Sequence, residues 1–150
     1  MTRINLLPPI KLTDSHLIAE IKEINQLSGS FRKSLSSKNG IKIERIPKRF
    51  TLNTGHVYFF YDKALYLHKR FNLLKIEALN RKFEITAEFN NEWLLAGRRD
   101  LYNDWQPCDE DVSLIVARIK TRLREKPYLY RYKKEKISDI ENFINLNYES

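Results

Sequence analysis

The chain has 150 residues, of which 42% are hydrophobic, a formal net charge of +8 and one cysteine. This length suits a single domain with one modest core. The lone cysteine excludes an internal disulfide and offers no metal cluster, so we expect no metal site. No apolar run approaches the length of a membrane-spanning helix. The first residues show no signal or transit peptide pattern, which favours the cytoplasm.

Positive charge is concentrated in two segments. Residues 1–50 carry ten Lys and Arg against four acidic residues, and residues 113–136 carry nine against two. Residues 51–112 and 137–150 sum to −2 and −3. If the fold brings the two basic segments together, they form one positive surface suited to a polyphosphate. The alternative is a generally basic protein whose charges are simply solvated.

The first predicted helix covers residues 14–27. Thr13 or Asp14 can cap its start, and Gly29 follows its end. Its apolar stripe consists of Leu17, Ile18, Ile21 and Ile24. A basic, loop-like stretch with a turn signal at Lys38-Asn39-Gly40 comes next.

The spacing of apolar residues predicts two further helices, over residues 61–82 and 109–125. Apolar residues recur there at steps of three and four, as on one helix face. The stripe of the longer helix consists of Phe60, Ala64, Leu67, Phe71, Leu74 and Ala78. Residues 84–107 are expected to be irregular, and the capping-box form of residues 138–141 predicts a short closing helix. No segment is typical of a strand, so the fold class is all-α, a compact single domain with three main helices.

The α-amine of Thr2 is a candidate nucleophile once Met1 is removed, which the small size of threonine favours. An α-amine has a pKa of about 7.7–8.0 and a lysine about 10.4. The neutral, reactive fraction at neutral pH is therefore a few hundredfold larger for the α-amine. Such an amine can attack the anomeric carbon of a sugar, displace the base and leave an imine that promotes elimination.

Glu23 is a candidate acid and base on the first helix. His16, Ala19, Glu23 and Gln26 are spaced three, four and three residues apart, so they share one helix face. A carboxylate on that face can stabilise the positive charge that develops on a sugar and can move protons. The alternative is a solvated residue that pairs with Lys22 or its neighbours.

Several motifs together resemble a known family. They are Met1 to Leu6, Asp14, His16-Leu17, Ala19-Glu20, Glu23, Gly29, Arg32-Lys33, Gly55-His56-Val57, Phe59 to Lys63, Leu67, Lys69-Arg70, Leu79, Arg81, Phe83 to Ile85, Asp104 to Pro107, Ala117-Arg118, Arg122 and Lys126 to Tyr132. In this combination the chain resembles the phage-type pyrimidine-dimer DNA glycosylases, the phage endonuclease V family.

The resemblance implies an N-terminal segment threaded between helices, a glycosylase-like domain over residues 1–134 and a helical extension over 135–150. It implies that the Thr2 amine is the nucleophile and Glu23 the acid and base. The expected activity is excision of cyclobutane pyrimidine dimers from duplex DNA, followed by β-elimination, without a cofactor. The expected partner is double-stranded DNA with damaged pyrimidines, bound by a monomer in the cytoplasm, at the nucleoid of a bacterium or phage-infected cell.

The expected DNA contacts come from both basic segments. They are Arg3, His16, Lys22, Gln26, Arg32, Lys33, Arg118, Arg122, Tyr130, Arg131 and Tyr132. Arg118 and Arg122 are four residues apart on one helix and can clamp phosphates together. Tyr128, Tyr130 and Tyr132 alternate with cations, which is typical of a stacking strip for distorted DNA. Alternatively, these tyrosines only cover the core.

Three positions depart from the family pattern. Lys22 and Gln26 stand where the family typically carries arginine, so one loses the bidentate fork and the other the charge. Leu129 replaces a tryptophan. These departures leave two alternatives open: the same mechanism on another damaged or modified base, or a non-catalytic protein that binds bent DNA.

Overall fold

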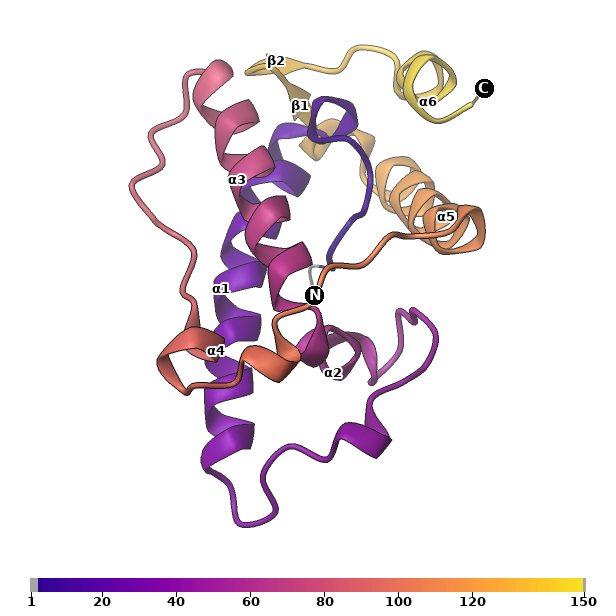
Figure 1. Ribbon diagram of the computed structural model, residues 1–150. Coiled ribbons are helices and arrows are strands. Elements are labelled where there is room, and N and C mark those ends of the chain that lie inside the picture. The colour runs from indigo at the N-terminus through magenta and orange to yellow at the C-terminus, as the bar shows by residue number, and fades with distance from the viewer. Residues whose placement is uncertain (1–2, 150) are drawn as a thin grey trace.

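The computed structural model describes residues 3–149, which fold almost entirely into helices and connecting loops (Figure 1). The elements are α1 (Asp14–Ser36), α2 (His56–Phe59), α3 (Ala64–Asn80), α4 (Glu92–Leu95), α5 (Asp109–Glu125), β1 (Arg131–Tyr132), β2 (Glu135–Lys136) and α6 (Ile140–Tyr148). The predicted all-α class is confirmed. The one departure within the described residues is the antiparallel hairpin β1–β2, which pairs Arg131 with Lys136 and Tyr132 with Glu135.

Helix α1 is longer than predicted. It runs beyond Gly29 to Ser36 because the apolar face continues past the glycine. Phe31 is fully buried and stacks on the Trp93 ring, with the ring centroids 4.4 Å apart. Packing of this turn against α4 outweighs the low helix propensity of one glycine.

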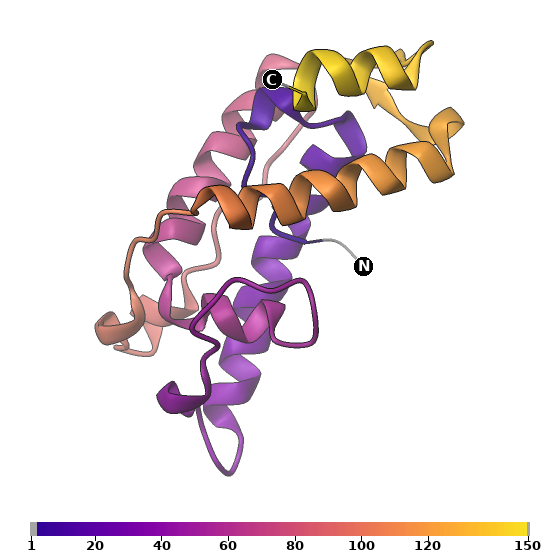
Figure 2. The same ribbon diagram turned by 90° about the vertical axis from the view of Figure 1, so that its right-hand side faces the viewer.

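Helix α3 lies beside α1 in both views of the ribbon, and these two helices enclose much of the core (Figures 1 and 2). Every residue of its predicted apolar stripe is buried. The helix itself is shorter than the predicted range 61–82, because a 3-10 turn over Phe60–Asp62 precedes it. At the other end Lys82 has a φ of 69° and the Phe83 amide donates to the Ala78 carbonyl, a geometry that ends the helix.

Helix α5 passes across the α1–α3 pair, and α6 packs beside it (Figure 2). The hairpin that joins these two helices is tied to the start of α1. The Asp14 carboxylate accepts hydrogen bonds from the backbone amides of Lys133 and Lys134, at 2.9 and 2.7 Å, and from Arg81 at 2.9 Å. The Tyr132 hydroxyl donates to the Ile10 carbonyl at 2.6 Å. The segment after α5 is thus held against the start of the chain.

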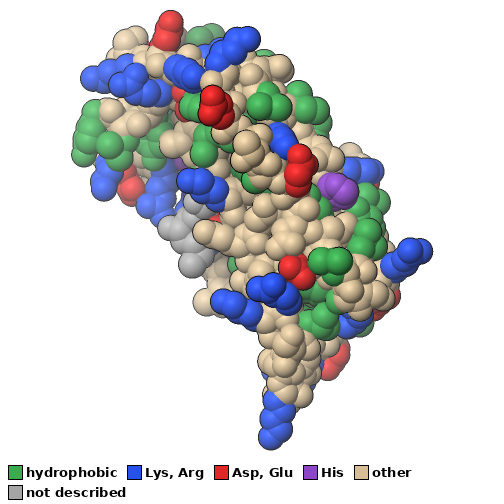
Figure 3. Space-filling model, turned by 90° about the vertical axis from the view of Figure 1, so that its left-hand side faces the viewer, with side chains coloured by type: hydrophobic (Ala, Val, Ile, Leu, Met, Phe, Trp, Pro, Cys, Tyr) green, Lys and Arg blue, Asp and Glu red, His purple; other side chains and the backbone are tan. Residues whose placement is uncertain are grey.

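The surface opposite to that of Figure 2 carries interspersed positive and negative side chains, with apolar ones between them (Figure 3). A mixed surface of this kind does not concentrate charge of one sign. Within residues 3–149, no helix combines the length and the apolar character needed to cross a membrane.

Candidate active site

The N-terminal segment is buried and is held by three different helices. The Ile4 amide donates to Nε2 of His56 in α2 at 3.1 Å, and the Asn5 amide donates to Oε1 of Glu20 in α1 at 3.1 Å. Arg70 in α3 donates to the Leu7 carbonyl. These contacts fix the backbone from Ile4 to Leu7. Thr2 itself lies outside the described residues.

His56 can accept the Ile4 hydrogen bond only in one neutral form. Its Nδ1 lies 2.8 Å from the Thr51 carbonyl, which can only accept, so Nδ1 carries the proton and Nε2 is the acceptor. Burial, together with Arg3 and Arg118, lowers the pKa of His56 to about 4 and keeps the ring neutral. Gly55 allows this arrangement, because a Cβ there would lie 3.0 Å from the Pro47 side chain.

Glu20 and Arg70 form a buried ion pair beneath the N-terminal segment. Two guanidinium nitrogens donate to the two carboxylate oxygens at 2.6 and 3.0 Å, and both side chains are almost inaccessible to water. A paired, doubly hydrogen-bonded carboxylate of this kind has a structural role. The pair was not among the site residues predicted from the sequence. Its signal was the helical spacing of two charged residues within the apolar stripes, since Glu20 lies between Leu17 and Ile24, and Arg70 between Leu67 and Leu74, at steps of three and four.

Glu23 lies one turn after Glu20 and has a different environment. Its exposed fraction is 8%, and it has no salt bridge to a described residue. Burial raises the pKa of its carboxyl, while the positive charges of Arg3 and Arg118 oppose that rise. A buried carboxyl with a raised pKa holds its proton to a higher pH than a solvated carboxyl does, which favours a role in proton transfer.

A hollow of about 240 Å³ joins the two basic segments, and Glu23 is not part of its lining. Its lining consists of Arg3, Asn5, Ser15, His16, Ala19, Arg118, Arg122 and Tyr130. Three of these side chains are arginines, which gives the hollow a strongly positive wall. The fold therefore brings together the N-terminal segment, the start of α1 and the exposed side of α5, as the charge pattern predicted.

His16 and Tyr130 form a stacked pair in the wall of the hollow. Their ring centroids are 5.3 Å apart and their planes differ by only 4°. Nδ1 of His16 also lies 2.7 Å from the Thr13 hydroxyl, the residue that caps α1. Burial, with Arg118 and Arg122 nearby, lowers the pKa of His16 to about 4. The imidazole is therefore neutral at physiological pH and does not add to the positive charge of the wall.

The other predicted contact residues lie outside this lining. Lys22, Gln26 and Lys33 are exposed on α1. Arg32 pairs with Glu92 at 3.7 Å. In the hairpin, Arg131 is exposed, whereas Tyr132 is half-buried. The Tyr132 ring packs against Arg81 and Phe143, which favours the core-covering interpretation for this tyrosine. Tyr128 is 66% exposed, so the three tyrosines do not form one continuous strip.

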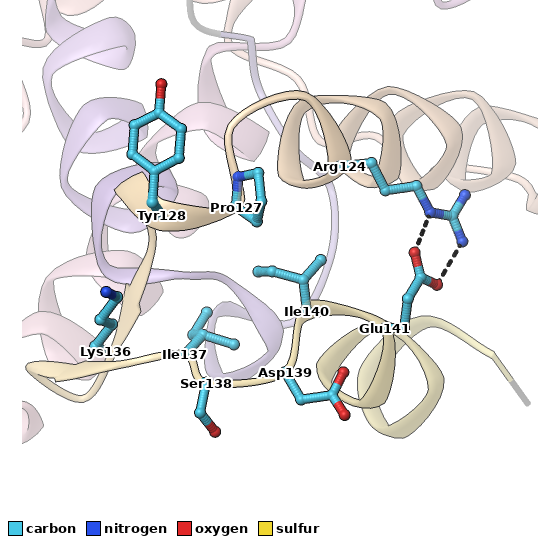
Figure 4. A pocket seen from close by; sticks show the side chains of 9 residues that line it. All are labelled: Arg124, Pro127, Tyr128, Lys136, Ile137, Ser138, Asp139, Ile140 and Glu141. Atoms are coloured by element: carbon cyan, nitrogen blue, oxygen red, sulfur yellow. Dashed lines mark hydrogen bonds and ion pairs between the residues drawn. The ribbon is translucent and has the colours of Figure 1, made fainter.

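A larger hollow, of about 660 Å³, lies between the end of α5 and the start of α6 (Figure 4). Its charges are balanced. Arg124 is bound by both oxygens of Glu141, at 2.8 and 3.0 Å, and Lys136 and Asp139 carry opposite charges. The smaller hollow is therefore the better candidate for binding a polyanion, because its lining, among the described residues, contains three arginines and no carboxylate.

His16 and His56 should make the protein less stable in acid. Both pKa values are lowered to about 4, from the ordinary histidine pKa of 6.5. Between these values only the unfolded state binds the protons. The free energy of unfolding should therefore fall as pH decreases, by up to about 1.4 kcal/mol per pH unit for each histidine. Denaturant titrations at pH 4 to 7 measure this slope. The variant His16→Gln should show a shallower slope, and an unchanged slope would contradict the assignment.

The chain matches the model of a family described as pyrimidine dimer DNA glycosylase, over residues 1–91. The matched region includes the N-terminal segment and all of α1, α2 and α3, and therefore Glu23, His56 and the Glu20–Arg70 pair. It ends before α5, so Arg118, Arg122 and Tyr130 join the hollow from a part of the chain outside the match. Because the match covers more than half of the 150 residues, this protein belongs to the pyrimidine dimer DNA glycosylase family.

Proposed function

We propose that the protein excises cyclobutane pyrimidine dimers from duplex DNA with the α-amine of Thr2 and then cuts the strand by β-elimination. The observation that carries this proposal is the anchoring of residues 4–7 beside an arginine-lined hollow and a buried carboxyl. A segment held by hydrogen bonds up to residue 4 restricts where an amine two residues earlier can reach. Restriction of this kind is what a positioned nucleophile requires.

The covalent steps begin with a neutral amine. Its nitrogen forms a bond to C1′ of the deoxyribose, and the bond between C1′ and the base breaks with its electron pair leaving on the base, which takes up a proton. The nitrogen then loses a proton. The C1′–O4′ bond opens, O4′ becomes a hydroxyl by protonation, and an imine remains between C1′ and the nitrogen. Loss of a proton from C2′ then breaks the C3′–O3′ bond and releases the phosphate.

Glu23 is the acid and base of these steps in this proposal. Its pKa, raised by burial, allows the carboxyl to deliver a proton to O4′ and, as a carboxylate, to stabilise the cationic sugar. The opposing effect of Arg3 and Arg118 on the pKa of the same carboxyl supports a site that contains all three groups.

We propose that the phosphates flanking the lesion are held by Arg3, Arg118 and Arg122. Burial lowers the pKa of the Arg118 guanidinium, and so do the charges of Arg122 and Arg3. Like charges this close repel one another, and a bound phosphate relieves that repulsion. Phosphate contacts fix the register of the duplex without reading its sequence, which suits an enzyme that recognises a distortion.

The base that is removed is the less constrained part of the proposal. Gln26 and Leu129, two of the departures from the family pattern, are both exposed. An exposed position can alter DNA contacts without disturbing the buried anchor of the N-terminal segment. The same mechanism on another damaged or modified base is therefore the second candidate.

Borohydride trapping tests the proposal directly, because it reduces an imine to a stable cross-link. The protein without Met1 should cross-link to ultraviolet-irradiated duplex and to duplex with a preformed abasic site, but not to undamaged duplex. Denaturing gels measure the cross-linked fraction, and peptide mass spectrometry locates the cross-link at Thr2. Cross-linking to abasic DNA alone would favour the second substrate candidate. No cross-link to any duplex would leave a non-catalytic DNA-binding protein.

A further inference from the structure

Asn5 has a buried side chain with unmet hydrogen-bonding capacity. Its exposed fraction is 0%, and among the described residues neither Nδ2 nor Oδ1 has a hydrogen-bond partner. Its backbone, by contrast, is fully bound: the amide donates to Glu20, and the carbonyl accepts from the Leu7 amide at 2.6 Å. Buried polar groups are nearly always paired, and an exception indicates that the group is kept for something other than stability.

The backbone next to Asn5 is also strained. Leu6 has a φ of 62°, in the left-handed region that residues other than glycine adopt at a cost in free energy. Strain and an unpaired amide at adjacent positions make this part of the segment costly to fold. Such costs gather at functional sites, where the local conformation serves binding or catalysis.

Asn5 belongs to the lining of the arginine-rich hollow. At about 240 Å³ the hollow is smaller than the roughly 300–1,000 Å³ of pockets that enclose whole ligands. It therefore suits one part of a nucleotide, and the arginines in its wall favour a sugar with its phosphates over a complete two-base lesion.

From these observations we propose that the Asn5 carboxamide is a catalytic residue that binds the ring-opened deoxyribose. This inference rests on the proposed function. In the closed sugar O4′ is an ether oxygen, which can only accept a hydrogen bond. In the imine it is a hydroxyl, which both donates and accepts, and a carboxamide offers the matching acceptor and donor. The amide reaches this hydroxyl by a change of rotamer or through one water. An interaction gained only after ring opening accelerates the reaction without tightening the initial complex.

The test separates this role from a structural one, because the two predict opposite effects on stability. Asn5→Leu keeps the branched shape of the side chain and removes the unpaired amide, and Asn5→Ala removes it without adding bulk. At least one of them should be as stable as the wild type in denaturant titrations, because no intramolecular hydrogen bond is lost. With saturating protein and abasic duplex, the maximal rate of borohydride trapping should fall about tenfold, while the protein concentration at half-maximal rate stays unchanged.

Asn25 provides the matched control. Its amide nitrogen donates to the Glu88 carbonyl at 3.0 Å, and its oxygen accepts from the Asn90 amide at 2.9 Å. Asn25→Leu should therefore lose stability and, where folded, trap at the wild-type rate. If both Asn5 variants are less stable than Asn25→Leu, or if a stable Asn5 variant traps at the wild-type rate, the role of Asn5 is rejected. Failure of the wild type to trap on abasic DNA would instead reject the proposed function itself.

Discussion

A protein whose Thr2 nitrogen carries an acetyl group should form no imine and cleave no DNA, although it should still bind duplex. Acylation removes the basic electron pair that attacks C1′, so the rate should fall by at least roughly a thousandfold. The arginines that line the hollow are unchanged by this modification, so the affinity for DNA should be largely retained. Single-turnover trapping measures the chemistry, and a binding titration at the same salt concentration measures the affinity. Intact-mass spectrometry verifies the state of the N-terminus.

Extension of the chain by one glycine before Thr2 is the matched control for this result. It restores a free amine but moves it by up to about 3.6 Å along an extended chain. The anchor at Ile4 and Asn5 is the same in both proteins, so only the reach of the amine differs. We expect a large loss of rate here too, smaller than for the acetylated protein. Normal processing of damaged DNA by the acetylated protein would rule out the α-amine as the nucleophile.

Replacement of Glu23 by glutamine should abolish base excision while the protein still folds and binds DNA. Loss of a positioned acid and base typically lowers a rate by roughly 10²- to 10⁴-fold. Because burial raises the pKa of Glu23 in the folded state, its ionised form opposes folding above the pKa of the unfolded state. Glu23→Gln should therefore be at least as stable as the wild type at neutral pH, and the difference should vanish as pH falls. Denaturant titrations and single-turnover excision assays measure the two effects.

Glu20→Gln is the contrasting variant, one helical turn away. Glu20 is fully buried and pairs with Arg70, so removal of its charge leaves an unpaired buried guanidinium. Such a change costs about 3–5 kcal/mol of stability. We expect Glu20→Gln to lose stability and Glu23→Gln to lose activity. If Glu23→Gln excised dimers at the normal rate, Glu23 would have no part in the chemistry.

The helices and their buried faces followed from the sequence, because side-chain periodicity is a local property that survives in the fold. The stripe from Phe60 to Ala78 is buried as predicted, and α5 has the predicted bounds. The errors occurred at helix ends and in the short helices α2 and α4, which were not predicted; α4 lies within residues 84–107, expected to be irregular. Gly29 does not end α1, since the contact of Phe31 with Trp93 depends on a segment far along the chain. No local pattern contains that information.

For the candidate site too, some features follow from local sequence and others depend on the folded structure. Residue type and spacing in the chain indicate candidates for chemistry: Thr2 after loss of Met1, a helix-borne Glu23 and two basic segments. Which of two neighbouring glutamates pairs with Arg70, and which has a raised pKa, depends on the folded arrangement. The tertiary structure also decided that His56 accepts from Ile4 and that the Asn5 side chain is buried without a partner among the described residues. Burial and pairing depend on what the rest of the chain places around a side chain, and that is not encoded at any single position.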